Sequence, residues 1–291
     1  GSNWTGAGTV AIQGANVSVA EVQSTSALVS VSGGSLSIPA GSTSTISSGS
    51  LAIGGQLATI EGSGRLVVGP SATGTISASR CSRAFLNGVT LVNQGTITTG
   101  TPSGAEDGSI WMENGAQLQN TGTFNDNSTE PGGCGFGRVP SINNNGGTTP
   151  TITNTGTFQS TNSQEPITIN VPFNNQGNLI SQAGTLQLSG GGTSTGSTFT
   201  APSGTTLEFA GGSFSLTGDT WSGAGTIAVS NASATTANLQ ATTAHVSVNR
   251  GSLNISEGST SRFTSLSLTE AGLAVAGELF VSSVLSAGGS G

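Results

Sequence analysis

Short bursts of alternating apolar and small polar residues run along the whole chain. Each burst is three to five residues long and is followed by Gly, Asn or Ser, as in LVSVS at Leu28, LEF at Leu207 and LNI at Leu253. A period of two with turn residues between the bursts is typical of short β-strands. No window carries a helical apolar stripe with capping residues, so the pattern predicts an all-β protein.

The spacing of the apolar anchors selects among all-β folds. Leu186, Leu207 and Ile227 follow one another at nearly equal steps, and two further anchors lie inside each step. Three short strands per coil predict a right-handed parallel β-helix, a three-sided solenoid of about 20–21 residues per coil and roughly 12–14 coils. Sandwiches and propellers need longer strands and more hairpin turns than this chain offers.

A recurring Asn pattern supports the same fold. The pattern Asn-[Gln/Thr]-Gly-[Thr/Asn]-[Ile/Phe/Leu] starts at Asn93, Asn120, Asn154 and Asn175. With one copy per coil, these side chains would stack as an amide ladder at roughly 4.8 Å spacing, and the Gly would occupy a corner without room for a Cβ. The first two intervals are longer than the third, which matches one plain coil, so each of the two contains an insertion. We expect those insertions to form loops within residues 80–147.

A long-range repeat is also present. Residues 4–46 return as residues 221–263 with 22 identities in 43 aligned positions. After a five-residue insertion the match resumes, with Leu51-Ala-Ile53 against Leu273-Ala-Val275. Such self-similarity is how tandem arrays are encoded.

The repeat sets the expected organisation of the chain. We predict a single solenoid over residues 1–291, in which residues 4–220 form one full repeat unit and residues 221–287 begin the next. Trp4 and Trp221 hold the same repeat position, which indicates a packing role for both.

Composition and charge exclude several classes of protein. The chain has 47 Gly, no Lys, only 7% charged residues and a net charge of −7. Without a basic run, it has no electrostatic means of binding nucleic acid. No stretch approaches the roughly 20 apolar residues of a membrane span, so we expect no membrane insertion.

The two cysteines, Cys81 and Cys134, have no spacing suited to zinc. In a chain of this composition they favour one disulfide, with two inert buried thiols as the alternative. We expect no metal site and no cofactor.

The segment from Gly184 to Ser230, GTLQLSGGGTSTGSTFTAPSGTTLEFAGGSFSLTGDTWSGAGTIAVS, resembles the Gly/Thr/Ser-rich repeats of large bacterial secreted β-helix proteins. These include hemagglutinin-like and autotransporter-passenger-like adhesins. The resemblance implies a right-handed parallel β-helix and extracellular or cell-surface display. We therefore expect a structural or adhesive segment, a stalk or surface-coat module, whose partners are neighbouring repeat units and a host or environmental glycan or surface.

Residues 80–138 are the exception to this uniformity. They hold both cysteines, half of the Arg residues, five of the thirteen acids and Trp111. Long loops on a rigid scaffold are where binding residues collect. The alternative function is thus a carbohydrate-binding or carbohydrate-cleaving β-helix that uses these loops. The candidate ligand-binding residues are Arg80, Arg83, Glu106, Asp107, Trp111, Asp126, Glu130 and Arg138.

Catalysis is the less favoured form of that alternative. Glycoside hydrolysis needs two carboxyls about 5–10 Å apart, and coil stacking could bring Glu106 or Asp107 to that distance from Asp126 or Glu130. The favoured interpretation is that these acids only solvate the loop tips and keep the chain soluble. We assign no catalytic residue. His245 is no exception, since it aligns with the apolar strand residue Leu28 and is expected to be a partly buried strand residue.

Thr-x-Thr pairs raise a second alternative, a Thr-lined face that binds ice or another crystal surface. Such a face requires the pairs to recur at one place in every coil. Their spacing is irregular. The pairs are Thr43/Thr45, Thr96/Thr98, Thr151/Thr153 and Thr193/Thr195.

Overall fold

The structure is a computed structural model that describes residues 2–55, 57–78, 83–100, 109–128, 141–163 and 166–288. Within these ranges every regular element is a β-strand and no helix occurs, so none could cross a membrane. The strands form a parallel β-solenoid of about 12 turns, which confirms the predicted fold class and the lower end of the expected coil number. The right-handed sense of the coil stays a prediction.

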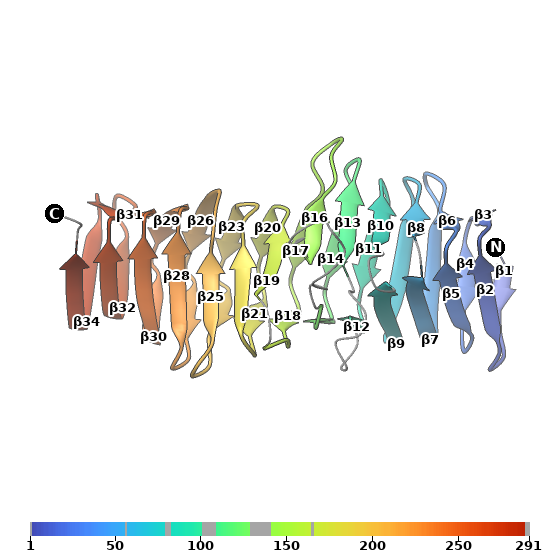
Figure 1. Cartoon of the computed structure of the whole chain (residues 1–291), viewed down its shortest axis with the longest axis horizontal. Coiled ribbons are helices and arrows are strands. Elements are labelled where there is room, and N and C mark those ends of the chain that lie inside the picture. Colours follow the sequence, from blue (N-terminus) through green and yellow to red (C-terminus); the bar gives the residue numbers. More distant parts are fainter. Residues whose placement is uncertain are drawn as a thin grey trace, which may run out of the picture. The chain divides into compact units, whose positions relative to one another are not determined.

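The chain divides into two compact units, Gly1–Thr157 and Phe158–Gly291. In both units a strand pairs with the strand one full coil later, in parallel, and three strands complete a coil (Figure 1). Each unit therefore has three faces, as the spacing predicts. The 13- and 14-residue strands β7 and β9 turn a corner and contribute to two faces each.

The faces of the first unit are as follows. The first face contains β1 (Ser2–Trp4), β4 (Val22–Ser24), the first parts of β7 (Thr43–Gly55) and β9 (Arg65–Ala78), β11 (Thr90–Asn93), β14 (Gln117–Asn120) and β17 (Thr151–Asn154). The second contains β2 (Thr9–Gln13), β5 (Leu28–Ser32), the remainders of β7 and β9, β12 (Thr96–Thr99) and β15 (Thr123–Asp126). The third contains β3 (Asn16–Ser18), β6 (Ser35–Ser37), β8 (Ala58–Glu61), β10 (Ala84–Asn87), β13 (Ile110–Glu113) and β16 (Ile142–Asn144).

The second unit repeats this plan. Its first face contains β20 (Phe173–Asn175), β23 (Gly192–Thr195), β26 (Ser213–Thr217), β29 (Ser233–Ala237), β31 (Ser252–Ile255) and β33 (Gly272–Val275). The second contains β18 (Thr157–Ser160), β21 (Asn178–Ser181), β24 (Thr198–Thr200), β27 (Thr220–Ser222) and the first parts of β30 (Gln240–Asn249), β32 (Thr260–Thr269) and β34 (Glu278–Gly288). The third contains β19 (Ile167–Asn170), β22 (Thr185–Leu188), β25 (Thr206–Phe209), β28 (Thr226–Ser230) and the remainders of β30, β32 and β34.

The register reproduces the coil length derived from the anchors. Leu186 pairs with Leu207, and Leu207 pairs with Ile227, so the steps between these anchors are the steps of the ladder. In the first unit the steps are longer, from Leu91 to Leu118 and from Leu118 to Ile152. Pairing stays in phase because the extra residues lie between strands rather than within them.

Inward-facing side chains form columns along the interior. Trp221 is fully buried, and its ring stacks on Phe209 at 5.5 Å between centroids and 24° between planes. Phe214 packs edge-on against Phe209 at 4.7 Å. Burial of these rings contributes roughly 25 cal/mol per Å² of apolar area removed from water. The packing role predicted for Trp221 is confirmed, whereas Trp4, in the first coil, is only partly buried.

Glycines mark the corners at which coils approach most closely. Gly122 follows Asn120, and a Cβ built on it would collide with the carbonyl oxygen of Gly95 in the preceding coil. Gly156 meets Gly122 in the same way. The corner role expected for the Gly of the Asn pattern is confirmed, and it depends on close approach of backbones rather than on positive φ.

Candidate functional site

A ladder of asparagines lies in the interior of the first unit. Asn93, Asn120 and Asn154 are fully buried and in register on β11, β14 and β17. Asn93 Nδ2 donates to Asn120 Oδ1, and Asn120 Nδ2 donates to Asn154 Oδ1, both at 2.7 Å. Each of these two amides also donates to a carbonyl of the next coil, Asn93 to Thr123 and Asn120 to Thr157, at 2.8 and 2.9 Å. The ladder therefore satisfies buried amides by bonding each coil to its neighbour.

The ladder has a defined start. Asn93 stands in register with Val68, which offers no donor, and its buried Oδ1 has no hydrogen-bond partner. In the second unit, Asn175 is buried as well, and its Nδ2 donates to the carbonyl of Gly177 at 3.4 Å. Ser194 follows Asn175 in register, so the polar column continues with a hydroxyl instead of an amide.

Asp126, a candidate ligand-binding residue, is fully buried at the end of β15. Its Oδ1 accepts hydrogen bonds from the hydroxyls of Thr99 and Ser128, at 2.8 and 2.6 Å, and from the Ser128 N–H at 3.1 Å. Its Oδ2 accepts from the Ser141 hydroxyl at 3.0 Å. This carboxylate bonds its own coil to the preceding one, because Thr99 lies one coil earlier, whereas Ser128 and Ser141 both lie between β15 and β16 of the same coil.

Arg83 and Trp111 lie together on the outer side of the third face of the first unit. The Arg83 guanidinium carbon is 3.9 Å from the centroid of the Trp111 ring, a cation–π contact. Phe85 stands in register with Trp111, and the two rings meet edge-on at 6.0 Å between centroids. All three side chains are partly buried, and the indole Nε1 of Trp111 is buried without a hydrogen-bond partner. We call this group the aromatic cluster.

A row of polar side chains lies two residues further along the same strands. Glu61, Asn87 and Glu113 are in register on β8, β10 and β13. Glu113 accepts a hydrogen bond from Asn145 Nδ2 at 2.6 Å, and Glu61 accepts one from the Ser35 hydroxyl at 2.7 Å. Together with the aromatic cluster, this row places flat apolar rings beside carboxylate and amide groups on one face.

The remaining candidates of the 80–138 region lie outside the described residues. They are Arg80, Cys81, Glu106, Asp107, Glu130, Cys134 and Arg138. The disulfide and the carboxyl pairs built on them therefore stay predictions. Phe85 was missed by the sequence analysis, although its outward position follows from the alternation in Ala84–Asn87 and its place one coil before Trp111.

Asp219 is a buried carboxyl in the second unit that the sequence analysis did not single out. It lies in the turn between β26 and β27 and is fully buried. Its Oδ1 accepts hydrogen bonds from the Ser197 N–H at 2.8 Å and the Ser194 hydroxyl at 2.9 Å, while its buried Oδ2 has no partner. Burial raises the pKa of Asp219 to about 6, because desolvation outweighs the lowering effect of those two hydrogen bonds.

His245 is exposed on the outer side of β30, so the expectation of partial burial is wrong. Its Nδ1 hydrogen-bonds with the Ser265 hydroxyl at 2.8 Å, and its Nε2 with the Ser267 hydroxyl at 3.2 Å. The repeat position shared by His245 and Leu28 therefore faces outward. At this position, two hydroxyls of the next coil hold the imidazole of His245.

The Thr-x-Thr pairs do not share a face. Thr43/Thr45 and Thr151/Thr153 lie on the first face of the first unit, but Arg65 and Gln117 occupy the matching positions in coils between them. The Thr96/Thr98 pair lies on the second face. A continuous Thr-lined plane is not formed by these pairs.

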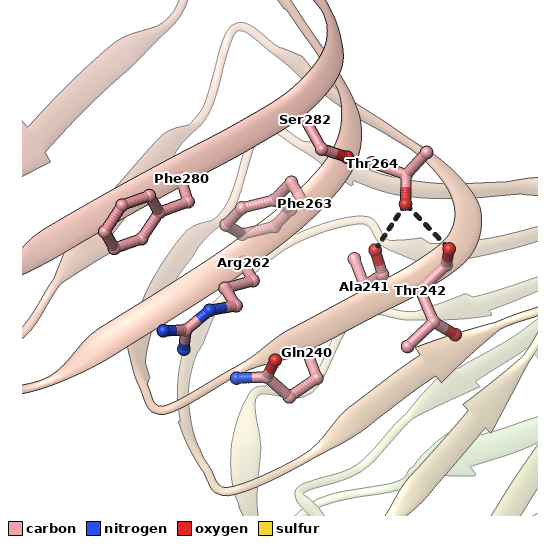
Figure 2. A pocket seen from close by; sticks show the side chains of 8 residues that line it. All are labelled: Gln240, Ala241, Thr242, Arg262, Phe263, Thr264, Phe280 and Ser282. Atoms are coloured by element: carbon pink, nitrogen blue, oxygen red, sulfur yellow. Dashed lines mark hydrogen bonds between the residues drawn. The ribbon is translucent and has the colours of Figure 1, made fainter.

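An open hollow of about 410 Å³ lies in the last coils of the second unit, beside β30, β32 and β34. Arg262 lies over the ring of Phe280 at 5.1 Å, and the Thr264 hydroxyl donates to the carbonyls of Ala241 and Thr242 (Figure 2). Arg262 is the sole ionisable residue of its lining, so the hollow has no acid–base pair. Within the described ranges, no group of three His, Cys, Asp or Glu residues could hold a metal ion.

Fold and sites together define a parallel β-solenoid repeat protein whose buried polar groups bond coil to coil. No family model, curated protein or solved structure matches the chain.

Removing one member of the asparagine ladder should destabilise the first unit. Asn120→Ala deletes the amide that bonds to both Asn93 and Asn154 and leaves a small cavity. We expect a loss of about 2–4 kcal/mol in the free energy of unfolding, measured by chemical denaturation. Gln117→Ala, an exposed position on the same strand, should change it by less than about 0.5 kcal/mol. Equal effects of the two substitutions would contradict a stabilising ladder.

Asp219 should make the chain more stable in mild acid. Its folded pKa of about 6 lies above the unfolded value of 3.8, so folding takes up a proton between these values. The contribution of this residue to stability therefore rises as the pH falls through about 6 and levels off below about 4, by up to about 3 kcal/mol.

Comparison with Asp219→Asn isolates this effect from the other carboxyls. The variant should be the more stable protein at pH 7, and its advantage should disappear near pH 4. A difference between the two chains that does not change with pH would show that Asp219 titrates normally.

Proposed function

We propose that this chain is a structural segment of a large extracellular repeat protein, a stalk or surface-coat module of a bacterial surface protein that serves adhesion. The observation that carries the proposal is that the long sequence repeat is also a repeat of strand register. Thr9 pairs with Leu28 as Thr226 pairs with His245. Asn16 pairs with Ser35 as Ser233 pairs with Ser252, and the offset along the chain is the same in both cases. Units that reuse both sequence and register are the means by which solenoids are extended.

The distribution of side chains supports a structural role. The core is made of columns in which each residue contacts its counterparts one coil away, and the buried polar groups form bonds in the same direction. Outward positions are mostly Ser, Thr, Asn and Gln, with few charges in the whole chain. Such a surface is hydrated without large charged side chains, which fits a segment that spaces other parts rather than one that carries out a reaction.

Secretion is supported by composition alone. A chain without Lys, rich in Gly, Ser and Thr and containing a single pair of cysteines resembles secreted repeat proteins more closely than intracellular enzymes. The neighbouring repeat units of the same polypeptide would be the main partners of such a segment.

A spacer must resist extension, and single-molecule pulling measures this directly. With handles near Ser2 and Gly288, we expect discrete unfolding events whose released length is a multiple of one coil. For a coil of about 20 residues this is about 70 Å. Asn120→Ala should lower the force of only those events that arise in the first unit. Extension at low force without discrete events would contradict the proposal.

A second candidate function is glycan binding at the aromatic cluster. Phe85 and Trp111 present ring surface on the outer side of a face, beside the hydrogen-bonding groups of Glu61, Asn87 and Glu113. Aromatic rings pack against the C–H faces of sugars, and carboxylates and amides bind their hydroxyls. The net charge of −7 makes a nucleic-acid base a poor alternative occupant of the same rings.

A glycan array separates the two candidates. If the cluster binds sugar, Trp111→Ala should lower retention of the bound glycan at least tenfold, the loss of about 1.4 kcal/mol or more. Phe280→Ala is a matched control, because Phe280, like Trp111, is an outward-facing ring beneath an arginine, Arg262. Absence of glycan retention by the unaltered chain, or equal losses in both variants, would remove the second candidate and leave the structural segment.

A further inference from the structure

The first coil of the chain has an incompletely covered interior edge. Its strands β1, β2 and β3 pair with β4, β5 and β6 on one side. Trp4, Val10 and Val17 face inward on these strands but are only partly buried. We call this surface the N-terminal edge.

A second copy of the same coil lies inside the second unit. Strands β27, β28 and β29 match β1, β2 and β3 in the long repeat and keep the same registers with the coil that follows. The residues equivalent to Trp4, Val10 and Val17 are Trp221, Ile227 and Ala234. All three are fully buried.

The coil that covers this internal copy is formed by residues 198–217, in β24, β25 and β26. Phe199 stands in register with Trp221, Leu207 with Ile227, and Phe214 with Ala234. Phe199 meets the Trp221 ring at 6.3 Å, and Phe209 of the same coil stacks on it at 5.5 Å. The tryptophan of the repeat is thus packed between aromatic rings of the preceding coil.

Backbone hydrogen bonds complete the covering. The N–H groups of Thr220, Thr226 and Ser233 donate to carbonyls of the preceding coil, at 2.8, 3.0 and 3.0 Å. Asn3 and Thr9 occupy the positions of Thr220 and Thr226 at the N-terminal edge. The edge therefore has the same strand registers, the same inward tryptophan and apolar residues at the other two inward positions, as a surface that is seen fully covered elsewhere in this chain.

We propose that the N-terminal edge is a docking surface for one kind of partner, a parallel β-solenoid coil with the inward aromatic residues of residues 198–217. The partner adds a coil in front of β1, β2 and β3 and packs aromatic rings on Trp4. The inference rests on the proposed function, since the end of a preceding repeat unit would supply such a coil.

A second copy of the chain is a poorer fit for this edge. The position that follows Trp221, Ala241 and Phe263 in their column is Val281, so the C-terminal coil would place Val281 rather than a phenylalanine over Trp4. Its outward side also carries Phe280, half exposed under Arg262. Head-to-tail association of two copies is therefore the competing possibility, and the experiment below distinguishes it.

Grafting the covering coil onto the full chain tests the proposal. Residues 178–220 are duplicated and joined directly before Trp4, so that the new Thr precedes Trp4 as Thr220 precedes Trp221. Trp4 fluorescence is isolated by subtracting the spectrum of the matching Trp4→Phe variant. We expect Trp4 emission to shift to shorter wavelength and its quenching by acrylamide to fall toward that of Trp221.

The matched control is a graft of residues 167–209, which has the same length but ends on a different face of the coil. This out-of-phase graft should leave Trp4 emission unchanged. An unshifted Trp4 with the in-phase graft, whether the graft is folded or unstructured, would overturn the proposal, because a docking edge templates the coil placed on it. Equal shifts with both grafts would also overturn it.

The last measurement is Trp4 emission of the ungrafted chain at increasing protein concentration. A Trp4 shift that grows with protein concentration would identify a second copy as the occupant and overturn the proposal in its stated form. If the in-phase graft does not shift Trp4 emission, the unfolding events expected in the pulling experiment stay the same, because mechanical resistance comes from coils already present in the chain. A chain without mechanical resistance could still dock the graft.

Discussion

Stacking of coils in register is the constraint on which the rest of this structure depends. Parallel strands of successive coils lie about 4.8 Å apart, so every inward side chain has fixed neighbours one coil before and one coil after it. A residue is acceptable only if it fits its column. The aromatic column around Trp221 and the asparagine ladder around Asn120 are two solutions to this requirement, one apolar and one polar.

Polar groups enter the interior where the column can satisfy them. Asp126 has donors on both carboxylate oxygens, from its own coil and the preceding one, whereas Asp219 has donors on one oxygen alone, and burial raises its pKa to about 6. Asn93, at the start of its ladder, also has a buried side-chain oxygen without a hydrogen-bond partner, because Val68 in the preceding coil provides no donor. The asparagine ladder is therefore less completely hydrogen-bonded at its start than at Asn120.

Much of the fold follows from the sequence, because strand period and coil length are both local patterns. The nearly equal steps between Leu186, Leu207 and Ile227 predict the observed register, and the Asn pattern predicts which residues share a column. The burial of single polar residues cannot be predicted from the sequence in this way. Asp219 and Asp126 look like solvated turn residues until the neighbouring coils are in place, and whether His245 faces in or out depends on the phase of one strand. Two members of the aromatic cluster, Arg83 and Trp111, were singled out from the sequence, but their neighbour Phe85 needed the register.

Crosslinking of designed cysteine pairs tests the register most directly. In a chain with Cys81→Ser and Cys134→Ser, the pair Thr185→Cys and Thr206→Cys joins two outward positions that are in register. Their Cα atoms should be about 4.8 Å apart, within the range of a disulfide. The pair Thr185→Cys and Glu208→Cys is offset by two residues, which places its Cα atoms beyond about 7 Å. The account predicts rapid intramolecular oxidation of the first pair and little of the second; comparable oxidation of both pairs, or faster oxidation of the offset pair, would contradict it.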